Sequence, residues 1–307
     1  MQFVKMHGAG NDFVLVDLLN PQSAIQDSQP DWSELARQVC DRHFGIGSDG
    51  LLLVLPSASA DARMRMFNPD GSESASCGNG IRCLGRYVRD RYGLGDPALH
   101  VETGAGPTTI TVRKDGLVTV DMGRPIFNAA DIPTTIIGDD ALDVTLSLDG
   151  ERIPVSCVSM GNPHAVTFVE PGILDAYPLD SIGPRVEHHP LFPQRTNFEV
   201  CEVLAPDHMR VRVWERGAGI TLACGTGACA AAVVGAMTGR IQPPVRIDLP
   251  GGQLEIDWNR EGAVFMTGPA KYVFTGTWST PIPTLLRVES PAPHQRMLVT
   301  AEASIVG

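Results

Sequence analysis

The feature that most constrains this chain is an internal repeat. Residues 63–68 read RMRMFN and residues 210–215 read RVRVWE, so in each segment arginine alternates with an apolar residue ahead of an aromatic and a polar residue. Nine positions after each segment comes a cysteine, Cys77 in the first case and Cys224 in the second. The equivalent positions all lie 147 residues apart. A fixed spacing across a strand, a loop and a turn predicts that the chain contains two copies of one domain.

Each copy is predicted to be α+β. The alternating arginine segments are typical of half-buried strands, and residues 108–122 predict a hairpin around Asp115-Gly116. Residues 79–92 place apolar side chains at helical spacing, with arginines on another face that we interpret as solvent-exposed. Residues 226–238 are small and apolar all round, which predicts a helix buried on every side. Residues 133–153 are predicted to form strands and loops.

Composition narrows the class of protein. The chain has 307 residues, of which 43 % are hydrophobic and 19 % charged, values typical of a globular protein with an ample core. A formal charge of −11 argues against nucleic acid or an anionic membrane as the partner. No apolar run is long enough for a transmembrane helix, and the first residues do not resemble a signal peptide. We therefore expect a cytoplasmic protein with reduced thiols, and we interpret Cys40, Cys157 and Cys201 as small buried hydrophobic residues.

The two repeated cysteines each open a glycine-containing turn at the start of a predicted helix, CGNGIRC and CGTGAC. A helix N-terminus presents unpaired N–H groups and a positive partial charge, so it can bind a carboxylate and lower a thiol pKa. If a pseudo-twofold axis relates the halves, both turns face one cleft. A carbon beside the bound carboxylate would then lie between two sulfurs, one removing a proton and the other delivering one to the opposite face.

Other roles for these cysteines fit the sequence less well. A structural disulfide is not expected in the cytoplasm. A metal site would need further ligands, and Cys83 and Cys229 are predicted to face away from the turns. A nucleophilic cysteine paired with a histidine would leave the duplication unexplained. We therefore expect neither a metal nor another cofactor.

The sequence does not fit a pyridoxal phosphate site or a dinucleotide-binding fingerprint. A pyridoxal phosphate racemase requires a Schiff-base lysine, and none of Lys5, Lys114 and Lys271 has a recognisable cofactor context. Residues 45–50 match G-x-G-x-x-G, but they follow a predicted helix rather than the strand that a dinucleotide fingerprint requires. We interpret Gly45 as a helix C-cap.

At these residues the sequence resembles the diaminopimelate epimerase family. The motifs KMHGAGNDFV, FNPDGSESASCGNGIRC, SMGNPH, WERGAGITLACGTGACAA and DLPGG recur there in this order, and the match covers roughly residues 1–280. The resemblance implies interconversion of LL- and meso-2,6-diaminopimelate for lysine and peptidoglycan synthesis, without a cofactor. It also implies two homologous domains related by a pseudo-twofold axis, each a mostly antiparallel sheet wrapped around a central helix, with the active site in the cleft between them.

The resemblance further implies roles for individual residues. Cys224 would be the base and Cys77 the acid from LL to meso, with roles reversed in the other direction. His164 and Glu215 would tune the thiol pKa values. The other implied substrate contacts are side chains of the cleft, including Glu215, and amides of the two cysteine turns: Asn11, Asn68, Asn162, Asn197, Glu215 and Arg216, with Gly78, Asn79, Gly225 and Thr226. Such a set suits a substrate with two zwitterionic ends, because amides donate and accept while a guanidinium meets the distal carboxylate.

The expected domains are residues 1–122, to which residues 269–280 return, and residues 123–268. Residues 281–307 form a C-terminal extension beyond the family's usual end, without an assigned role. Two further departures from the family are Gly50, where many members carry glutamine, and Ile220, where glutamate is usual and whose change removes a polar group near the site.

Two other functions remain open on the sequence. One is racemisation of another amino acid, such as histidine, on the same fold, and the other is non-catalytic binding of an amino acid. The partner in every case is a small-molecule amino-acid substrate, and a homodimer is a further expectation.

Overall fold

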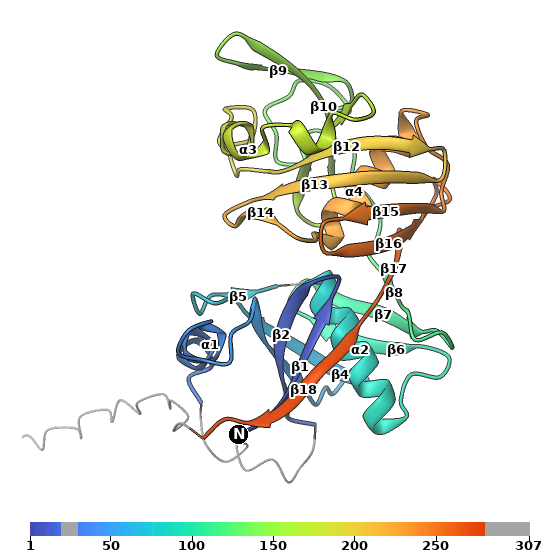
Figure 1. Ribbon diagram of the computed structural model, residues 1–307. Coiled ribbons are helices and arrows are strands. Elements are labelled where there is room, and N and C mark those ends of the chain that lie inside the picture. The colour runs from blue at the N-terminus through green and yellow to red at the C-terminus, as the bar shows by residue number, and fades with distance from the viewer. Residues whose placement is uncertain (20–29, 76, 280–307) are drawn as a thin grey trace, which may run out of the picture.

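A computed structural model describes residues 1–19, 30–75 and 77–279. It has two lobes, one above the other in Figure 1. The predicted extension 281–307 lies outside the described residues. The lower lobe contains β1 (Gln2–Gly8), β2 (Asn11–Asp17), α1 (Trp32–Cys40), β3 (Gly50–Leu55), β4 (Ala62–Phe67), β5 (Glu73–Ser74), α2 (Gly78–Tyr92), β6 (Leu99–Thr103), β7 (Gly106–Val112), β8 (Val118–Asp121) and β18 (Lys271–Thr277).

The upper lobe repeats this order of elements. It contains β9 (Val144–Leu148), β10 (Glu151–Ser159), β11 (Pro163–Val169), a short 3₁₀ turn (Leu174–Ala176), α3 (Leu179–Glu187), β12 (Asn197–Ala205), β13 (His208–Glu215), β14 (Gly219–Thr221), α4 (Gly225–Met237), β15 (Val245–Leu249), β16 (Gly252–Asp257) and β17 (Phe265–Gly268). Among the described residues, no helix is long and apolar enough to cross a membrane.

Strand pairing confirms the predicted duplication. In the lower lobe β4 pairs antiparallel with β3 and β5 and parallel with β6. In the upper lobe β13 pairs antiparallel with β12 and β14 and parallel with β15. The equivalent strands β8 and β17 pair with each other and join the lobes into one continuous sheet. The chain is thus α+β with two repeated, mostly antiparallel sheets, as predicted.

In each repeat, the strand that follows the last strand crosses over and pairs in the other lobe. β9, which follows β8, pairs with β10 of the upper lobe. β18, which follows β17, returns to the lower lobe and pairs with β1, as its orange-red ribbon among the blue strands shows in Figure 1. The two lobes are therefore held together by strand pairing as well as by side-chain packing.

The two central helices are packed differently, as their sequences predicted. α4 is built from small apolar residues, and almost all of them are buried. α2 buries Ile81, Leu84 and Val88 and ends at Gly93, whose φ of 68° is the left-handed conformation that glycine adopts without strain. Residues of both helices belong to one apolar cluster that spans the lobes. This shared cluster brings the first turns of the two helices together.

One sequence interpretation was wrong at the start of β3. α1 ends at Cys40 and is followed by Asp41, so Gly45 is not its cap. Gly45 lies in the following turn, where its N–H donates to the Asp41 carbonyl at 3.0 Å. The G-x-G-x-x-G segment therefore lies between a helix and a strand, and this order is the reverse of a dinucleotide-binding turn.

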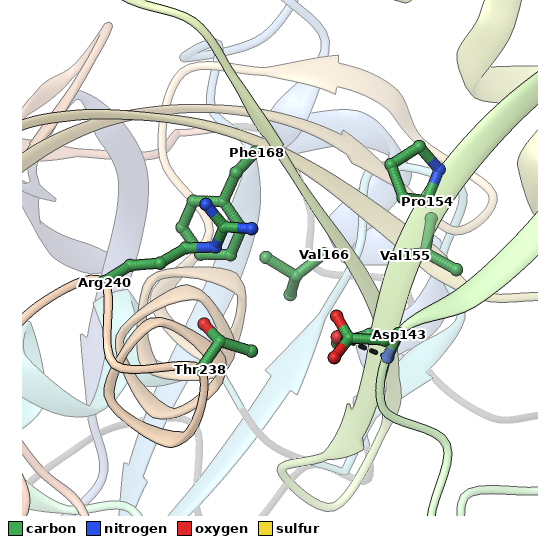
Figure 2. Close-up of a pocket in the computed structure, with 8 residues that line it drawn as sticks. Asp143, Pro154, Val155, Val166, Phe168, Thr238 and Arg240 are labelled. Carbon is green, nitrogen blue, oxygen red and sulfur yellow. Dashed lines mark hydrogen bonds between the residues drawn. The ribbon is translucent and has the colours of Figure 1, made fainter.

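A small pocket in the upper lobe lies apart from every predicted site residue. Residues of β10, β11 and the segment after α4 line it, and Figure 2 shows Arg240 stacked over the ring of Phe168. The guanidinium carbon lies 4.8 Å from the ring centroid. The hydrogen bond drawn there joins the Asp143 N–H to the Ser156 hydroxyl at 3.0 Å.

Candidate active site

Both cysteines occupy the N-cap positions of the central helices, as predicted. The Cys77 Sγ accepts a hydrogen bond from the Gly80 N–H at 3.4 Å, and the Cys224 Sγ accepts one from the Gly227 N–H at 3.3 Å. Both N-cap residues have extended backbones, which turn the chain into the helix. Each sulfur is therefore fixed beside the positive end of a helix. Neither cysteine forms a disulfide.

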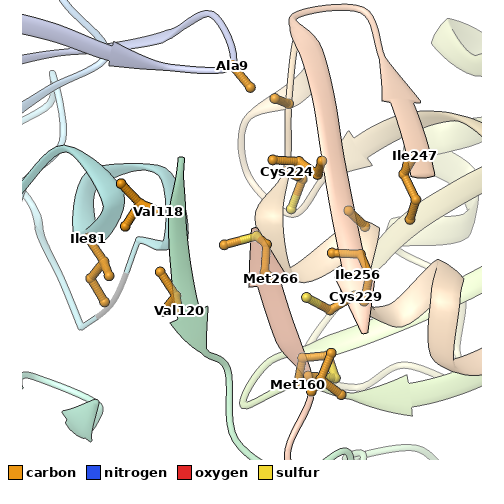
Figure 3. Close-up of a cluster of buried hydrophobic side chains, with 14 of the residues drawn as sticks. Ala9, Ile81, Val118, Val120, Met160, Cys224, Cys229, Ile247, Ile256 and Met266 are labelled. Carbon is orange, nitrogen blue, oxygen red and sulfur yellow. The ribbon is translucent and has the colours of Figure 1, made fainter. Parts of the chain in front are cut away.

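The two cysteine turns meet at the junction of the lobes. A Cβ on Gly78 would lie 3.9 Å from the Gly225 Cα, and one on Gly225 would lie 3.1 Å from the Met266 Sδ. Figure 3 shows Met266 between the strand that carries Val118 and Val120 and the turn that carries Cys224. A Cβ on Gly78 would also lie 3.0 Å from the Met266 Cε, so a side chain at either position would require the Met266 side chain to shift.

A side-chain amide links the two turns directly. The Asn79 Nδ2 donates to the Ala223 carbonyl at 3.1 Å and to the Asn11 Oδ1 at 3.0 Å. Asn11 Oδ1 in turn faces the Cys77 Sγ at 3.9 Å. The sequence singled out the backbone amide of Asn79, and the structure shows that its side chain also fixes the register between the lobes.

Arg82 corrects the prediction that the arginines of this helix are solvent-exposed. Its side chain is completely buried. The guanidinium donates to the Asn79 Oδ1 at 2.7 Å and to the Pro269 carbonyl at 3.2 Å, with longer contacts to the Gly78 carbonyl and the Met266 sulfur. These partners are all neutral. A Cβ on Gly8 would lie 3.0 Å from its Nη2 and one on Gly268 would lie 3.1 Å from its Nε, so two glycines distant in the sequence leave room for this side chain.

The thiol pKa values also correct the sequence analysis, which expected the helix termini to lower them. Burial raises the pKa of Cys77 to about 11, against the opposing effect of the Gly80 N–H. Burial also raises the pKa of Cys224 well above its ordinary value, and the nearby Glu215 and Glu199 carboxylates raise it further. Desolvation disfavours a thiolate more strongly than the amides stabilise it. Burial therefore opposes ionisation of both thiols.

Glu215 lies at the end of β13 beside Cys224. Burial raises the pKa of its carboxyl group, while a hydrogen bond from the Thr221 hydroxyl at 2.5 Å lowers it. Side chains alternate along a strand, so Ile220 lies on the face of β14 opposite Thr221. The side chain of Ile220 therefore points away from Glu215.

The departure at Gly50 has a packing explanation. A Cβ there would lie 2.9 Å from the Met66 Cε and 3.0 Å from the Phe67 carbonyl. The space next to this strand is thus already filled, and a glutamine would displace Met66.

The remaining predicted side chains have partners of their own within the protein. Asn11 Nδ2 donates to Asp49 at 2.8 Å. Asn197 is buried, donates to the Pro163 carbonyl at 2.8 Å and accepts the Arg216 N–H at 2.9 Å. The Arg216 guanidinium donates only to the Gln194 carbonyl among the described hydrogen bonds, at 3.2 Å. Its side chain therefore has donors left for a ligand.

Asn68 follows β4 at the position equivalent to Glu215, and its amide donates to the Ser72 hydroxyl at 3.0 Å. Asn162 and His164 lie beside Cys224, where Asn162 Nδ2 donates to the Thr226 hydroxyl at 3.3 Å. His164 is completely buried between Asn162 and Glu199. Sequence analysis did not identify Glu199, although an isolated acid in the apolar run NFEVCEV is a detectable signal.

Comparison with known proteins agrees with this geometry. The family model described as diaminopimelate epimerase matches residues 3–128 and 156–273. A diaminopimelate epimerase from Synechococcus elongatus is 50 % identical over 280 residues, covering 90 % of this chain and 98 % of the relative. One from Desulfitobacterium hafniense is 49 % identical over 280 residues, covering 90 % and 97 %.

Two solved structures share the fold at low sequence identity. A phenazine biosynthesis protein of the PhzF family from Bacillus anthracis has a TM-score of 0.64 at 18 % identity, with 90 % of this chain and 98 % of that chain covered. A probable proline racemase from Agrobacterium radiobacter has a TM-score of 0.63 at 17 % identity, with 91 % and 93 % covered.

Proposed function

The chain belongs to the diaminopimelate epimerase family and is an epimerase, and from this premise we propose that it interconverts LL- and meso-2,6-diaminopimelate. The observation that carries the mechanism is the meeting of two helix N-termini, each capped by a cysteine, at one junction. Two acid–base groups on opposite sides of one carbon are what inversion without a cofactor requires.

The substrate's reacting carboxylate is held by the first amides of both helices. These N–H groups have no partner within a helix, and both helix dipoles favour an anion there. We assign this role to the backbone of Gly78, Asn79, Gly225 and Thr226. Binding in this position places the adjacent Cα between the two sulfurs.

Proton exchange then proceeds in one direction across the carbon. From the LL isomer, the Cys224 thiolate takes the Cα proton, so the C–H bond breaks and an S–H bond forms. The Cys77 thiol gives its proton to the opposite face, which forms the new C–H bond and leaves Cys77 as thiolate. The meso isomer is inverted by the reverse sequence. The protein ends each turnover with the two protonation states exchanged, and no other reagent is consumed.

One of the two thiols must lose its proton before this chemistry while the other keeps it, and burial opposes that loss because it raises the pKa of both. The helix amides beside each sulfur stabilise the thiolate once it forms. Glu215, which lies next to Cys224, is the group we assign to the substrate ammonium and to the tuning of that thiol.

The distal end of the substrate is assigned to the side chains around Arg216. Its guanidinium meets a planar carboxylate with two parallel donors. Asn197 fixes the Arg216 backbone, and the amides of Asn11, Asn68 and Asn162 supply both donors and acceptors. A substrate whose distal end also carries an ammonium and a carboxylate can form hydrogen bonds with all of these side chains.

The test is proton exchange measured in D₂O. Wild-type protein incubated with LL-diaminopimelate should incorporate deuterium at one Cα and produce the meso isomer, while L-histidine and L-lysine should remain unlabelled. Labelling of another amino acid instead would establish a different racemase. Binding of diaminopimelate without labelling would establish a non-catalytic protein.

Two finer expectations remain predictions. We propose the cytoplasm as the site of reaction, because a two-thiol mechanism requires reduced cysteines. The expected homodimer is tested by sedimentation of the purified chain.

A further inference from the structure

A hydrogen-bonded chain of side chains leads from a buried carboxylate to one of the two sulfurs. Glu199 Oε1 lies 2.7 Å from His164 Nδ1, and His164 Nε2 lies 3.0 Å from Asn162 Oδ1. Asn162 Nδ2 donates to the Thr226 hydroxyl at 3.3 Å, and that hydroxyl lies 3.5 Å from the Cys224 Sγ. Four contacts therefore connect Glu199 on β12 with the cap of α4.

The orientation of Asn162 fixes the protons along this chain. Because its Nδ2 donates to Thr226, the atom that faces His164 is the oxygen Oδ1. An oxygen acceptor there requires a proton on His164 Nε2. A second proton lies between His164 Nδ1 and Glu199. If Nδ1 holds it, an imidazolium faces a carboxylate, and if Glu199 holds it, a neutral imidazole faces a carboxylic acid. Both arrangements hold the same number of protons and have no net charge.

The surroundings favour this neutral arrangement. Glu199 and His164 are completely buried, and Glu199 Oε2 has no hydrogen-bond partner. The titratable groups that face the pair from the neighbouring elements are the thiols of Cys157 and Cys201, the carboxyl group of Glu215, and Cys224 itself. None of these groups is a cation. A pair with a net negative charge would therefore be uncompensated in the core.

Loss of the proton shared by His164 and Glu199 would reverse the donor and acceptor roles along this chain of hydrogen bonds. His164 would then keep a proton on Nδ1 for Glu199 and present a lone pair at Nε2, opposite the Asn162 oxygen. The Asn162 amide would have to rotate so that Nδ2 faces His164, and the Thr226 hydroxyl would turn to donate to Asn162. Cys224 would lose the Thr226 hydroxyl as a donor and keep the Gly227 N–H.

We propose that Glu199 is a positioning residue that holds a proton on the His164 pair and thereby directs the Thr226 hydroxyl onto the Cys224 sulfur. A hydroxyl that donates to sulfur stabilises the thiolate rather than the thiol. Glu199 also lies against the first turn of α4, where a Cβ on Gly227 would come within 2.7 Å of its Oε1. This inference rests on the proposed role of Cys224 as a base, and it can be tested without any substrate.

The first measurement is the protonation of His164. In protein labelled with ¹⁵N at histidine, the His164 Nε2 should be protonated from pH 7 to pH 8. An unprotonated Nε2 over this range would overturn the proposal, because the chain could not then run toward Cys224. This measurement uses wild-type protein and does not depend on how any variant folds.

The second measurement is the ionisation of Cys224, followed by iodoacetamide alkylation and peptide mapping in the Cys77→Ala background. Because the proposed Glu199–His164 pair has no net charge, Glu199→Leu removes a hydrogen-bond partner but no net charge from beside Cys224, and it should lower the alkylation rate at pH 8 about tenfold, the effect of one hydrogen bond to a charged group. Glu199→Gln should restore most of the rate, because its amide can donate to Nδ1 and leave Nε2 protonated. Equal losses in the leucine and glutamine variants, or an unchanged rate in folded Glu199→Leu, would overturn the proposal.

Two further variants separate this role from a general structural one. Glu202→Gln changes a second buried carboxylate of the same strand, paired with Arg210, and should leave the alkylation of Cys224 unchanged. Thr226→Val removes the hydroxyl that donates to the Cys224 sulfur. It should therefore lower the alkylation rate as much as Glu199→Leu does, and the double variant should show no further loss of rate. Additive losses of alkylation rate would show that Glu199 and Thr226 act separately, which would contradict the proposed hydrogen-bonded chain of side chains.

With Cys77 intact, Glu199→Leu should lower kcat for diaminopimelate about tenfold and change KM little, since the carboxylate touches no substrate. If wild-type protein fails to epimerise diaminopimelate, the proposed function falls while the histidine and thiol measurements still decide the role of Glu199. If wild type is active and those measurements fail, the function stands and the positioning role falls.

Discussion

Replacing Arg82 with methionine separates stability from activity. Arg82 is a buried cation whose short hydrogen bonds reach the Asn79 side chain and the Pro269 carbonyl, both neutral. Methionine fills a similar volume with a flexible apolar chain. The change removes the charge and the donors but leaves little empty space.

The effect on the free energy of unfolding is a difference between two large terms. Two acceptors left buried without donors cost about 1–3 kcal/mol each. Removing a buried guanidinium that has no anionic partner returns several kcal/mol of desolvation free energy. Because the terms oppose each other, we expect the stability of Arg82→Met to lie within about 3 kcal/mol of wild type.

The effect on activity has no such compensation. Without Arg82, the Asn79 amide is no longer oriented toward the Ala223 carbonyl and Asn11, and these two bonds hold the cysteine turns in register. At about 1 kcal/mol for each neutral bond, the loss is about 2 kcal/mol, or roughly 30-fold in kcat/KM.

The assay combines urea unfolding with deuterium exchange on LL-diaminopimelate. Arg89→Met is the matched control, because Arg89 lies two turns further along the same helix and makes only a long contact to Asp96, at 3.7 Å. This variant should retain full activity. A stable Arg82→Met protein with wild-type kcat/KM would refute the reasoning, since the register between the turns would then not depend on this side chain.

Cys77→Ala and Cys224→Ala should each abolish epimerisation of LL-diaminopimelate while the circular dichroism stays near wild type, and a near-wild-type rate in either would exclude the two-thiol mechanism. Arg216→Lys should weaken binding of diaminopimelate by about 1.5–3 kcal/mol, roughly 10- to 150-fold, because an ammonium cannot form two parallel bonds to the distal carboxylate; unchanged kinetics would place that carboxylate elsewhere. The raised pKa of Cys77 predicts a pH-dependent stability: its contribution is complete below the unfolded value of 9.0 and is lost as the pH rises through about 11. Between pH 8.5 and pH 11, urea titrations should show wild type losing about 1–3 kcal/mol more than Cys77→Ala, and equal losses would contradict this assignment.

The parts of the structure that the sequence predicted depend on local patterns. Alternation along residues 63–68 and 210–215 identified two strands, and glycines after each cysteine identified two helix starts. The fixed spacing then predicted that the halves share a topology, and the strand pairings confirm it.

The parts that the sequence did not predict depend on distant segments. Arg82 is buried because Met266 and Pro269, far along the chain, close over it. The thiol pKa values are raised because the assembled lobes exclude water from both turns, an effect opposite to that of the helix termini alone. No local sequence pattern predicts the burial of Arg82 or the raised thiol pKa values.

Divergence between the repeats makes the two thiols unequal. Arg82 of the first half is replaced by Cys229 in the second, and Asn68 is replaced by Glu215. Glu215 raises the pKa of both thiols, but only Cys77 has a cation, Arg82, that lowers its pKa, and only Cys224 has a second acid, Glu199, that raises its pKa. Burial raises the pKa of both thiols, but the acids raise that of Cys224 further. In the proposed reaction each thiolate serves one isomer as base, so unequal thiols would make Cys77 the easier of the two to ionise. A donor directed onto Cys224 opposes that difference, because it stabilises the thiolate that the surrounding acids disfavour. The duplication thus placed one cysteine in each repeat, and substitutions at equivalent positions of the two repeats make the pKa values of their thiols differ.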